Sequence, residues 1–120
     1  MLNLDTHMVV ALLRGDLTPV EDRLLARQKL AMSDIVLWEL SKLVQTGRLE
    51  MEMESDEFHR FLRSVTVFPI TLEIARTSTR LDFTSDPADE IIAATSIVQS
   101  VPLLTRDRRI LKSRLVPFAR

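Results

Sequence analysis

The sequence predicts a single α/β domain, in which a mostly parallel β-sheet is covered by helices. Its 120 residues, 46% of them apolar, are enough to form one hydrophobic core. Short apolar segments alternate with segments of helical periodicity, and such alternation implies parallel strands joined by helical crossovers. The chain has only two glycines and no linker rich in Pro, Gly or Ser, so no boundary divides residues 1–120.

The first predicted strand is Met1–Leu4, a short apolar run of the kind found in buried parallel strands. It is followed by an apolar segment of helical length at residues 8–13. A second helix is expected from Pro19, since Thr18 and Glu21 have the capping-box spacing that satisfies free backbone N–H groups at a helix start.

A second strand and helix are predicted over residues 29–47. The brief apolar stretch at 29–32 is the strand, and Ser33 is expected to cap a helix whose apolar residues recur over 35–44. Gly47 is expected to end that helix. Residues 49–54 alternate apolar and acidic side chains, which is compatible with either a short strand or an extended loop.

The middle of the chain repeats this pattern. Apolar residues at i, i+3, i+4 and i+7 predict a helix over 58–65. Residues 66–70 are β-branched and aromatic, and therefore favour a third strand. Thr71 is expected to cap a helix that runs to about Leu81.

The last part of the chain carries another clear helix start. Asp86 is expected at the N-cap and Pro87 at the first helical position, before an apolar helix over 91–98 that is buried on more than one side. Residues 102–105 are expected to form a buried strand. Residues 116–118 contain a proline and are therefore expected only as an edge strand.

Composition excludes several classes of protein. With no cysteine there is no disulfide framework, thiolate zinc site or thiol nucleophile, and His7 and His59 are too few for a histidine-rich metal site. The formal net charge of -1 does not suggest general adhesion to nucleic acid. The longest uncharged run, 91–105, is too short to span a membrane, and the N-terminus does not resemble a secretory signal. A soluble cytoplasmic protein is expected.

Four acidic residues are candidates for a functional site. Ligands of open α/β sheets bind outside the carboxyl ends of the strands. Asp5 follows the first predicted strand and Asp107 follows the strand at 102–105. Glu39 lies in the helix after the second strand, and Asp89 lies in the first turn of the helix that begins at Pro87. These four acids are expected to converge on one rim of the sheet.

Clustered carboxylates without neutralising cations repel one another, and a hard divalent cation removes that penalty. Oxygen ligands without cysteine or clustered histidine suit Mg²⁺ or Mn²⁺ rather than Zn²⁺. Such an ion can activate water and stabilise a displacement at phosphorus. The acidic cluster therefore predicts metal-dependent phosphodiester chemistry.

Each acid also has a structural explanation. Asp5 can cap the helix that follows it, Glu39 can be an ordinary exposed helical residue, and Asp89 is favoured at its position by the helix dipole. Asp107 can open a turn. Asp86 is better explained as an N-cap than as a metal ligand.

The C-terminal fifteen residues are basic. They contain one acid and six basic residues: Arg106, Arg108, Arg109, Lys112, Arg114 and Arg120. This cluster is either a solvated surface or a region that attracts a phosphate backbone toward the site, in which case Arg106, Arg108 and Arg109 are candidate contacts for that backbone. The sequence has no P-loop and no GxGxxG motif.

Four short segments, spread in order over essentially the whole chain, form a recognisable set: Leu4–His7, Leu37–Leu40, Asp86–Thr95 and Leu103–Asp107. Together they resemble the PIN-domain family, in particular the VapC-type toxins of toxin–antitoxin pairs. The resemblance implies a PIN-like α/β/α sandwich and a Mg²⁺- or Mn²⁺-dependent endoribonuclease. It also implies an RNA substrate, a homodimer, and a cognate VapB-like antitoxin that inserts a C-terminal segment across the active-site groove.

The resemblance assigns roles to the same four acids: Asp5, Glu39, Asp89 and Asp107. Of these, Asp5, Asp89 and Asp107 would hold the metal, and Glu39 would position a second ion or the attacking water. Thr6 and Thr105 match hydroxyl positions that flank the site in the family.

Two residues depart from the family pattern. Glu90 stands where relatives often carry arginine, which puts one salt bridge or RNA contact in doubt. Asn3 makes the first strand less apolar than usual.

Two other functions remain open. One is a non-catalytic module that binds RNA or an antitoxin, although a decayed enzyme would be expected to have lost at least one of the four acids. The other is a phosphoacceptor receiver-like domain, which also clusters acids at strand ends. A receiver requires a lysine that closes the last strand, whereas here Thr105 leads to Arg106 and Asp107.

Overall fold

A computed structural model describes residues 1–119 of the chain. Strands and helices alternate as predicted. A 3₁₀-helix, Ile110–Lys112, follows the last strand. The other elements, in chain order, are β1 (Leu2–Leu4), α1 (Thr6–Arg14), α2 (Pro19–Leu25), β2 (Leu30–Ser33), α3 (Ile35–Gln45), α4 (Asp56–Ser64), β3 (Val65–Phe68), α5 (Leu72–Ser78), α6 (Pro87–Gln99) and β4 (Leu103–Leu104).

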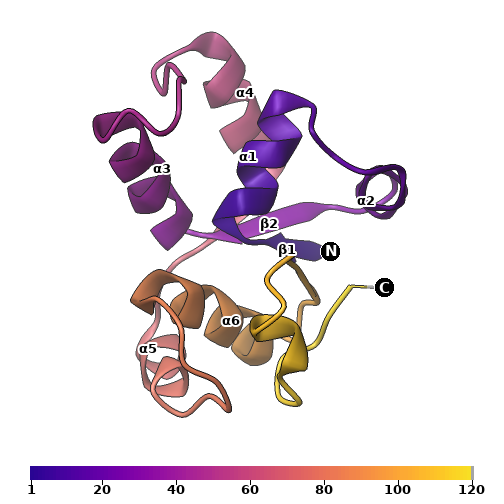
Figure 1. The fold of residues 1–120 in the computed structure, drawn as a ribbon, viewed down its shortest axis with the longest axis vertical. Helices are drawn as coiled ribbons and strands as arrows, with labels where there is room; N and C mark the ends of the chain where they lie inside the picture. The colour runs from indigo at the N-terminus through magenta and orange to yellow at the C-terminus, as the bar shows by residue number, and fades with distance from the viewer. Residues whose placement is uncertain (120) are drawn as a thin grey trace.

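The four strands form one parallel sheet in the order β3-β2-β1-β4. β1 is central, with Leu2 opposite Leu30 of β2 and Asn3 opposite Leu103 of β4. Helices α1, α3 and α4 lie on one side of the sheet, and α5 and α6 lie on the other (Figure 1). The predicted α/β/α sandwich with a parallel sheet is confirmed.

The hydrophobic core lies on both faces of the central strands. β1 and all but the first residue of β2 are buried, as expected for strands that helices cover on both sides. The number of buried residues differs between helices, from one in α4 and one in α5 to six in α6, which is buried on more than one side. The largest fully buried apolar side chains are Leu2, Leu4, Met8, Val9, Met32, Val36, Leu40, Ile74, Ile92, Leu103 and Ile110. Within this core, the parallel pairing of β1 with β4 places the carboxyl ends of the two strands side by side.

Helix α1 begins two residues before the predicted segment because Asp5 caps it. The Met8 backbone N–H donates to Asp5 Oδ1 at 2.9 Å. The helix ends at Gly15, whose φ of 74° is a left-handed conformation that glycine adopts without strain. The cap places the Asp5 side chain at the turn between β1 and α1.

Two other predicted helix starts are confirmed. In α2, Glu21 N–H donates to Thr18 Oγ1 at 3.2 Å, and Thr18 N–H donates to Glu21 Oε1 at 2.9 Å, which completes the capping box. In α5, Ile74 N–H donates to the Thr71 hydroxyl at 3.2 Å. Helix α5 stops at Ser78, three residues before the predicted end.

One predicted cap lies at a different residue, and another lies at the predicted residue without a side-chain capping bond. Ser33 is the last residue of β2 rather than the N-cap of α3, although its hydroxyl still accepts a bond from Ile35 N–H at 3.2 Å. Asp34 occupies the N-cap position without a side-chain capping bond. Asp86 likewise occupies the N-cap position of α6, but its side chain makes no capping bond. Proline at the next position is already enough to start α6.

The structure defines three weakly patterned segments. Residues 49–54, where both a short strand and a loop were compatible with the sequence, form turns and loop, and Ser55 then caps α4 through Phe58 N–H at 3.1 Å. β3 lies at Val65–Phe68 instead of 66–70. The predicted edge strand at 116–118 is a single parallel bridge between Phe118 and Leu103. Within residues 1–119, no helix is long and apolar enough to cross a bilayer.

Candidate active site

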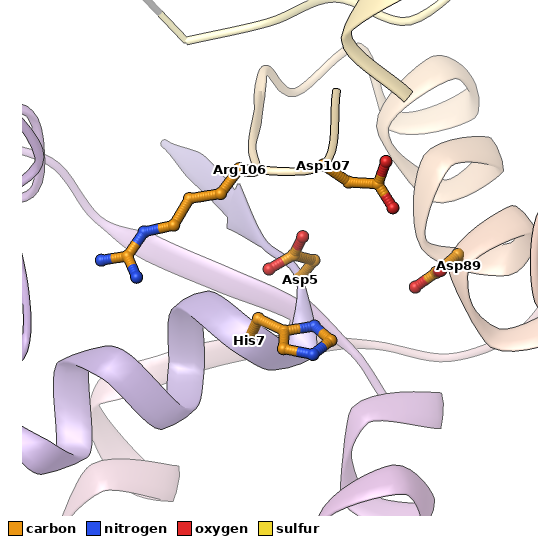
Figure 2. Close-up of a pocket in the computed structure, with 5 residues that line it drawn as sticks. All are labelled: Asp5, His7, Asp89, Arg106 and Asp107. Atoms are coloured by element: carbon orange, nitrogen blue, oxygen red, sulfur yellow. The ribbon is translucent and has the colours of Figure 1, made fainter. Parts of the chain in front are cut away.

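An acidic cleft lies at the carboxyl ends of β1 and β4. It has a volume of about 300 Å³ and is lined by Asp5, His7, Asp89, Arg106 and Asp107. Figure 2 shows three aspartates around one space: Asp5 after β1, Asp107 after β4, and Asp89 from the first turn of α6. Segments distant in the sequence therefore meet at the predicted rim.

Asp5 is the most buried acid of the cleft, with 4% of its surface exposed. Burial raises its pKa, while hydrogen bonds with the Thr105 side chain and the Met8 backbone oppose the increase. Asp5 therefore both caps α1 and lines the cleft, so its structural explanation does not exclude a role in the site.

Glu39 lies in α3 beside the cleft and is partly buried. The Thr6 hydroxyl donates a hydrogen bond to Glu39 Oε1. Burial raises the pKa of Glu39, the Thr6 bond opposes this, and the negative charge of Asp89 raises it further. Glu39 does not line the cleft itself, but its charge is coupled to the charge of Asp89.

Asp89 is electrostatically the central member of the four acids. The Ser85 hydroxyl donates to Asp89 Oδ2 at 2.9 Å and orients the side chain. Burial raises the pKa of Asp89, and Asp86 and Asp107 raise it further, against the Ser85 bond. Since Asp89 in turn raises the pKa values of Asp5 and Glu39, the four predicted acids form one interacting group.

Asp107 lies in the loop after β4. Its Oδ1 accepts from the backbone N–H of Arg109 at 2.9 Å and of Ile110 at 3.4 Å. Its own backbone N–H donates to the Thr105 hydroxyl at 3.1 Å. The turn that the sequence allowed for Asp107 thus exists, and it presents the carboxylate to the cleft (Figure 2).

Arg106 lines the cleft, but its guanidinium group is engaged on the opposite side. Its Nε and Nη2 donate to Glu21 Oε2 and Oε1 at 2.8 and 2.6 Å, and Nη2 also donates to the Asp16 carbonyl at 3.0 Å. In Figure 2 the guanidinium extends away from the aspartates. Arg106 therefore ties α2 to the rim of the cleft. A different arginine pairs with a cleft acid, since Arg109 Nε lies 3.9 Å from Asp107 Oδ1.

The pairing of Arg106 with Glu21 makes the stability of the fold depend on pH. The hydrogen bond from Arg106 is the main reason why the pKa of Glu21 falls from 4.5 to about 2. Because the folded pKa lies below the unfolded one, the pair stabilises the fold above about pH 4.5, and this contribution is lost as the pH falls toward 2.

We expect Glu21→Gln to retain the cap of α2 but to remove this contribution, which for a partly exposed pair is at most about 1 kcal/mol. The difference in urea midpoint between wild type and Glu21→Gln should therefore shrink between pH 5 and pH 2. Glu50→Gln, at an exposed glutamate, is the control. A constant difference at all pH values would contradict the assignment.

The donor set of the cleft suits a hard divalent cation. Its three aspartates and the neighbouring Glu39 offer carboxylate oxygens, and burial and mutual repulsion raise the pKa values of Asp5, Glu39 and Asp89. A bound cation would relieve both penalties. Within residues 1–119, no three acidic or histidine side chains are already arranged to hold a metal ion. The chemistry of the residues therefore fits the ion, whereas the arrangement is not that of a preformed chelate.

Sequence reasoning gave little weight to His7 and did not identify Ser85 or Glu21. His7 lines the cleft and, by its charge, lowers the pKa values of neighbouring acids, including Asp5. Ser85 lies four residues before Asp89, a spacing that could have indicated a partner for this acid. Nothing in the sequence indicates the pairing of Glu21 with Arg106, since 85 positions separate them.

Comparison with known proteins identifies a family and a fold. The model of the PIN domain family matches residues 3–114. A search of curated proteins found no match.

Solved structures with a similar fold include a toxin–antitoxin complex from Klebsiella pneumoniae (TM-score 0.72, 20% identity, 93% of this chain and 91% of that chain covered). VapBC2 from Rickettsia felis, bound to a DNA fragment from its promoter, has a TM-score of 0.71 at 16% identity, with 99% and 98% covered. FitAcB from Neisseria gonorrhoeae has a TM-score of 0.70 at 19% identity, with 99% and 97% covered. At these identities the likeness establishes the fold.

Proposed function

Because the chain belongs to the PIN domain family, whose members are generally nucleases, we propose that it is a metal-dependent endoribonuclease and the toxin of a toxin–antitoxin pair. One observation carries the proposal. Three aspartates from distant parts of the chain, Asp5, Asp89 and Asp107, line one cleft at the carboxyl ends of β1 and β4, and Glu39 of α3 lies beside it. Membership of the PIN family also argues against a phosphoacceptor receiver domain.

The three cleft aspartates, Asp5, Asp89 and Asp107, are the residues that would hold Mg²⁺ or Mn²⁺. When bound, the ion supplies an activated water and stabilises charge on the phosphate during an in-line displacement. Ser85 supports this role because its hydroxyl donates to Asp89 and restricts that carboxylate. Thr105 supports it because its hydroxyl accepts a hydrogen bond from the backbone N–H of Asp107.

Glu39 acts beside the aspartates in this proposal. The Thr6 hydroxyl holds the Glu39 carboxylate, so that it can accept a hydrogen bond from the attacking water and orient it toward phosphorus. Attack by water breaks the bond to the 3′ oxygen, which leaves with a proton. The ribose 2′-OH takes no part in this reaction.

The proposed reaction predicts the chemical ends of the products. We expect every cut to leave a 5′-phosphate and a 3′-hydroxyl, because water rather than the 2′-OH attacks phosphorus. Mass spectrometry of products from a short synthetic RNA distinguishes these ends. A 2′,3′-cyclic phosphate would contradict the mechanism, because it forms only when the ribose hydroxyl is the nucleophile.

Basic residues beside the cleft are proposed RNA contacts. Arg108 and Arg109 are exposed next to Asp107, and their charges are placed to attract the phosphate backbone. Arg106 is less available because Glu21 and the Asp16 carbonyl occupy its guanidinium. A contact between Arg106 and RNA therefore requires competition with Glu21.

An antitoxin partner and a homodimer complete the proposal. The similar structures include toxin–antitoxin complexes, which supports a VapB-like antitoxin as the partner.

Trp38 on α3 and Leu72 on α5 have 56% and 76% of their surfaces exposed and offer apolar contact area for a second subunit. We expect sedimentation to give a dimer mass that falls on dilution. A monomer mass at every concentration would contradict the homodimer.

A non-catalytic binding module is the second candidate. The lack of a preformed chelating group within residues 1–119 favours it. In that case the acidic cleft would bind RNA or an antitoxin without cleaving RNA. A metal-dependent cleavage that requires Asp89 would exclude this candidate.

A further inference from the structure

Asn3 is a buried amide in the middle of β1, between the buried side chains of Leu2 and Leu4. Its Nδ2 donates to the Ile92 carbonyl oxygen at 3.2 Å and to Ser96 Oγ at 2.9 Å, both in α6. These bonds join parts of the chain that lie 89 and 93 positions apart. We propose that Asn3 is a positioning residue: it fixes α6 against β1 and thereby sets the placement of Asp89 relative to Asp5.

The spacing of the residues supports this role. Asn3 and Asp5 are two positions apart on an extended segment, so their side chains project to the same side. Asp89, Ile92 and Ser96 follow the i, i+3, i+7 spacing and therefore share one face of α6. One row thus carries Asn3 and Asp5, and the row packed against it carries Ser96, Ile92 and Asp89.

The two acceptors of Asn3, the Ile92 carbonyl oxygen and Ser96 Oγ, lie one helical turn apart and therefore constrain the orientation of α6 as well as its contact with β1. A bond to Ile92 alone would allow α6 to rotate about that carbonyl, and a bond to Ser96 alone would leave the N-terminal turn less constrained. Together they fix both the rotation and the translation of α6 along β1. The Ser85 hydroxyl then orients the Asp89 side chain on a helix whose position is already determined.

Stability alone does not account for an amide at this position. Among residues 1–119, buried Asn3 Oδ1 finds no hydrogen-bond partner, which is unfavourable, and leucine would match the neighbouring residues of the strand. A buried polar side chain can, however, select one packing register where apolar side chains would permit several. The inference is that Asn3 favours a single arrangement of the two aspartates at some cost in stability.

The position of α6 can be measured without metal and without activity. The chain has no cysteine, so spin labels can be attached at Thr66→Cys in β3 and Gln99→Cys at the end of α6. We expect Asn3→Leu to shift or broaden the distance distribution between the labels. Leu49→Ala, which removes core volume outside β1 and α6, is the control and should leave it unchanged.

Metal binding provides the second measurement and rests on the proposed function. Mn²⁺ is titrated into the unlabelled protein, and the free ion is followed by electron paramagnetic resonance. We expect the Asn3→Leu variant to bind Mn²⁺ at least about tenfold more weakly than the wild-type protein does. The unfolding midpoint of Asn3→Leu should not fall in parallel. Ser96→Ala should weaken binding less, and should add nothing in the Asn3→Leu background, because both changes remove the same link.

The possible outcomes separate the two proposals. A wild-type label distance in Asn3→Leu overturns the inference, and so does a changed distance with wild-type Mn²⁺ affinity. If the wild-type chain binds no Mn²⁺, the proposed metal-dependent function fails. In that case the label distance alone decides whether Asn3 positions α6.

Discussion

Asp89→Asn is expected to reduce RNA cleavage by about a thousandfold or more. Removal of a metal-holding carboxylate withdraws several kcal/mol of transition-state stabilisation, and each 1.36 kcal/mol corresponds to a factor of ten in rate. Asp89 is also the acid whose charge is coupled to the other three. Single-turnover cleavage of a labelled RNA measures the loss.

Asp86→Asn is the matched control for Asp89→Asn. Asp86 lies three positions earlier at the start of α6 and carries the same charge, but it does not line the cleft. Asparagine is equally suitable at an N-cap position, so the helix should be retained. We expect the control to keep activity within about tenfold of wild type. Equal losses in the two variants would mean that only the general acidity of this helix start matters.

Asp5→Asn is expected to abolish cleavage without lowering the stability of the metal-free protein. The Asp5 carboxylate is buried beside Asp89, so neutralisation removes a desolvated charge and a repulsion. The asparagine Oδ1 can still accept the hydrogen bond from Met8 N–H that caps α1. Urea unfolding in the presence of EDTA compares the two proteins.

Asp5→Ala distinguishes the two roles of this residue. It removes the charge as asparagine does, but it also removes the cap, so it should be less stable than Asp5→Asn by about 1 kcal/mol. Both variants should be inactive. If the Asp5→Asn variant unfolds as readily as the Asp5→Ala variant, or loses the folded state, the charge of Asp5 itself stabilises the fold. The proposal that this charge serves the cleft and only the cap serves stability would then be wrong.

Much of the fold was predictable because local chemistry determines it. Thr18 and Glu21 form the predicted capping box, and Pro87 starts α6 where the sequence indicated. The four apolar segments became parallel strands, because short apolar runs separated by helices can be buried only in a covered parallel sheet. The convergence of Asp5 and Asp107 then follows from the adjacency of β1 and β4.

The remaining details depend on contacts between distant residues. The pairing of Arg106 with Glu21 spans 85 positions, and the bond from Asn3 to Ser96 spans 93. No local pattern encodes such partners, because each depends on how α2 and α6 pack against the sheet. Residues 49–54 were ambiguous for a related reason: alternation of apolar and acidic side chains also occurs in a loop that packs one side on the core.

Cleavage of a 5′-labelled pool of structured RNA by the purified chain tests the central proposal most directly. Parallel reactions contain Mn²⁺, Mg²⁺ or EDTA, with Asp89→Asn as the inactive reference. The acidic cleft predicts discrete cuts with either ion for wild type and none with EDTA or for the variant. Cutting that persists in EDTA and in Asp89→Asn, or an inert wild type that still binds RNA, would contradict a metal-dependent nuclease at this cleft.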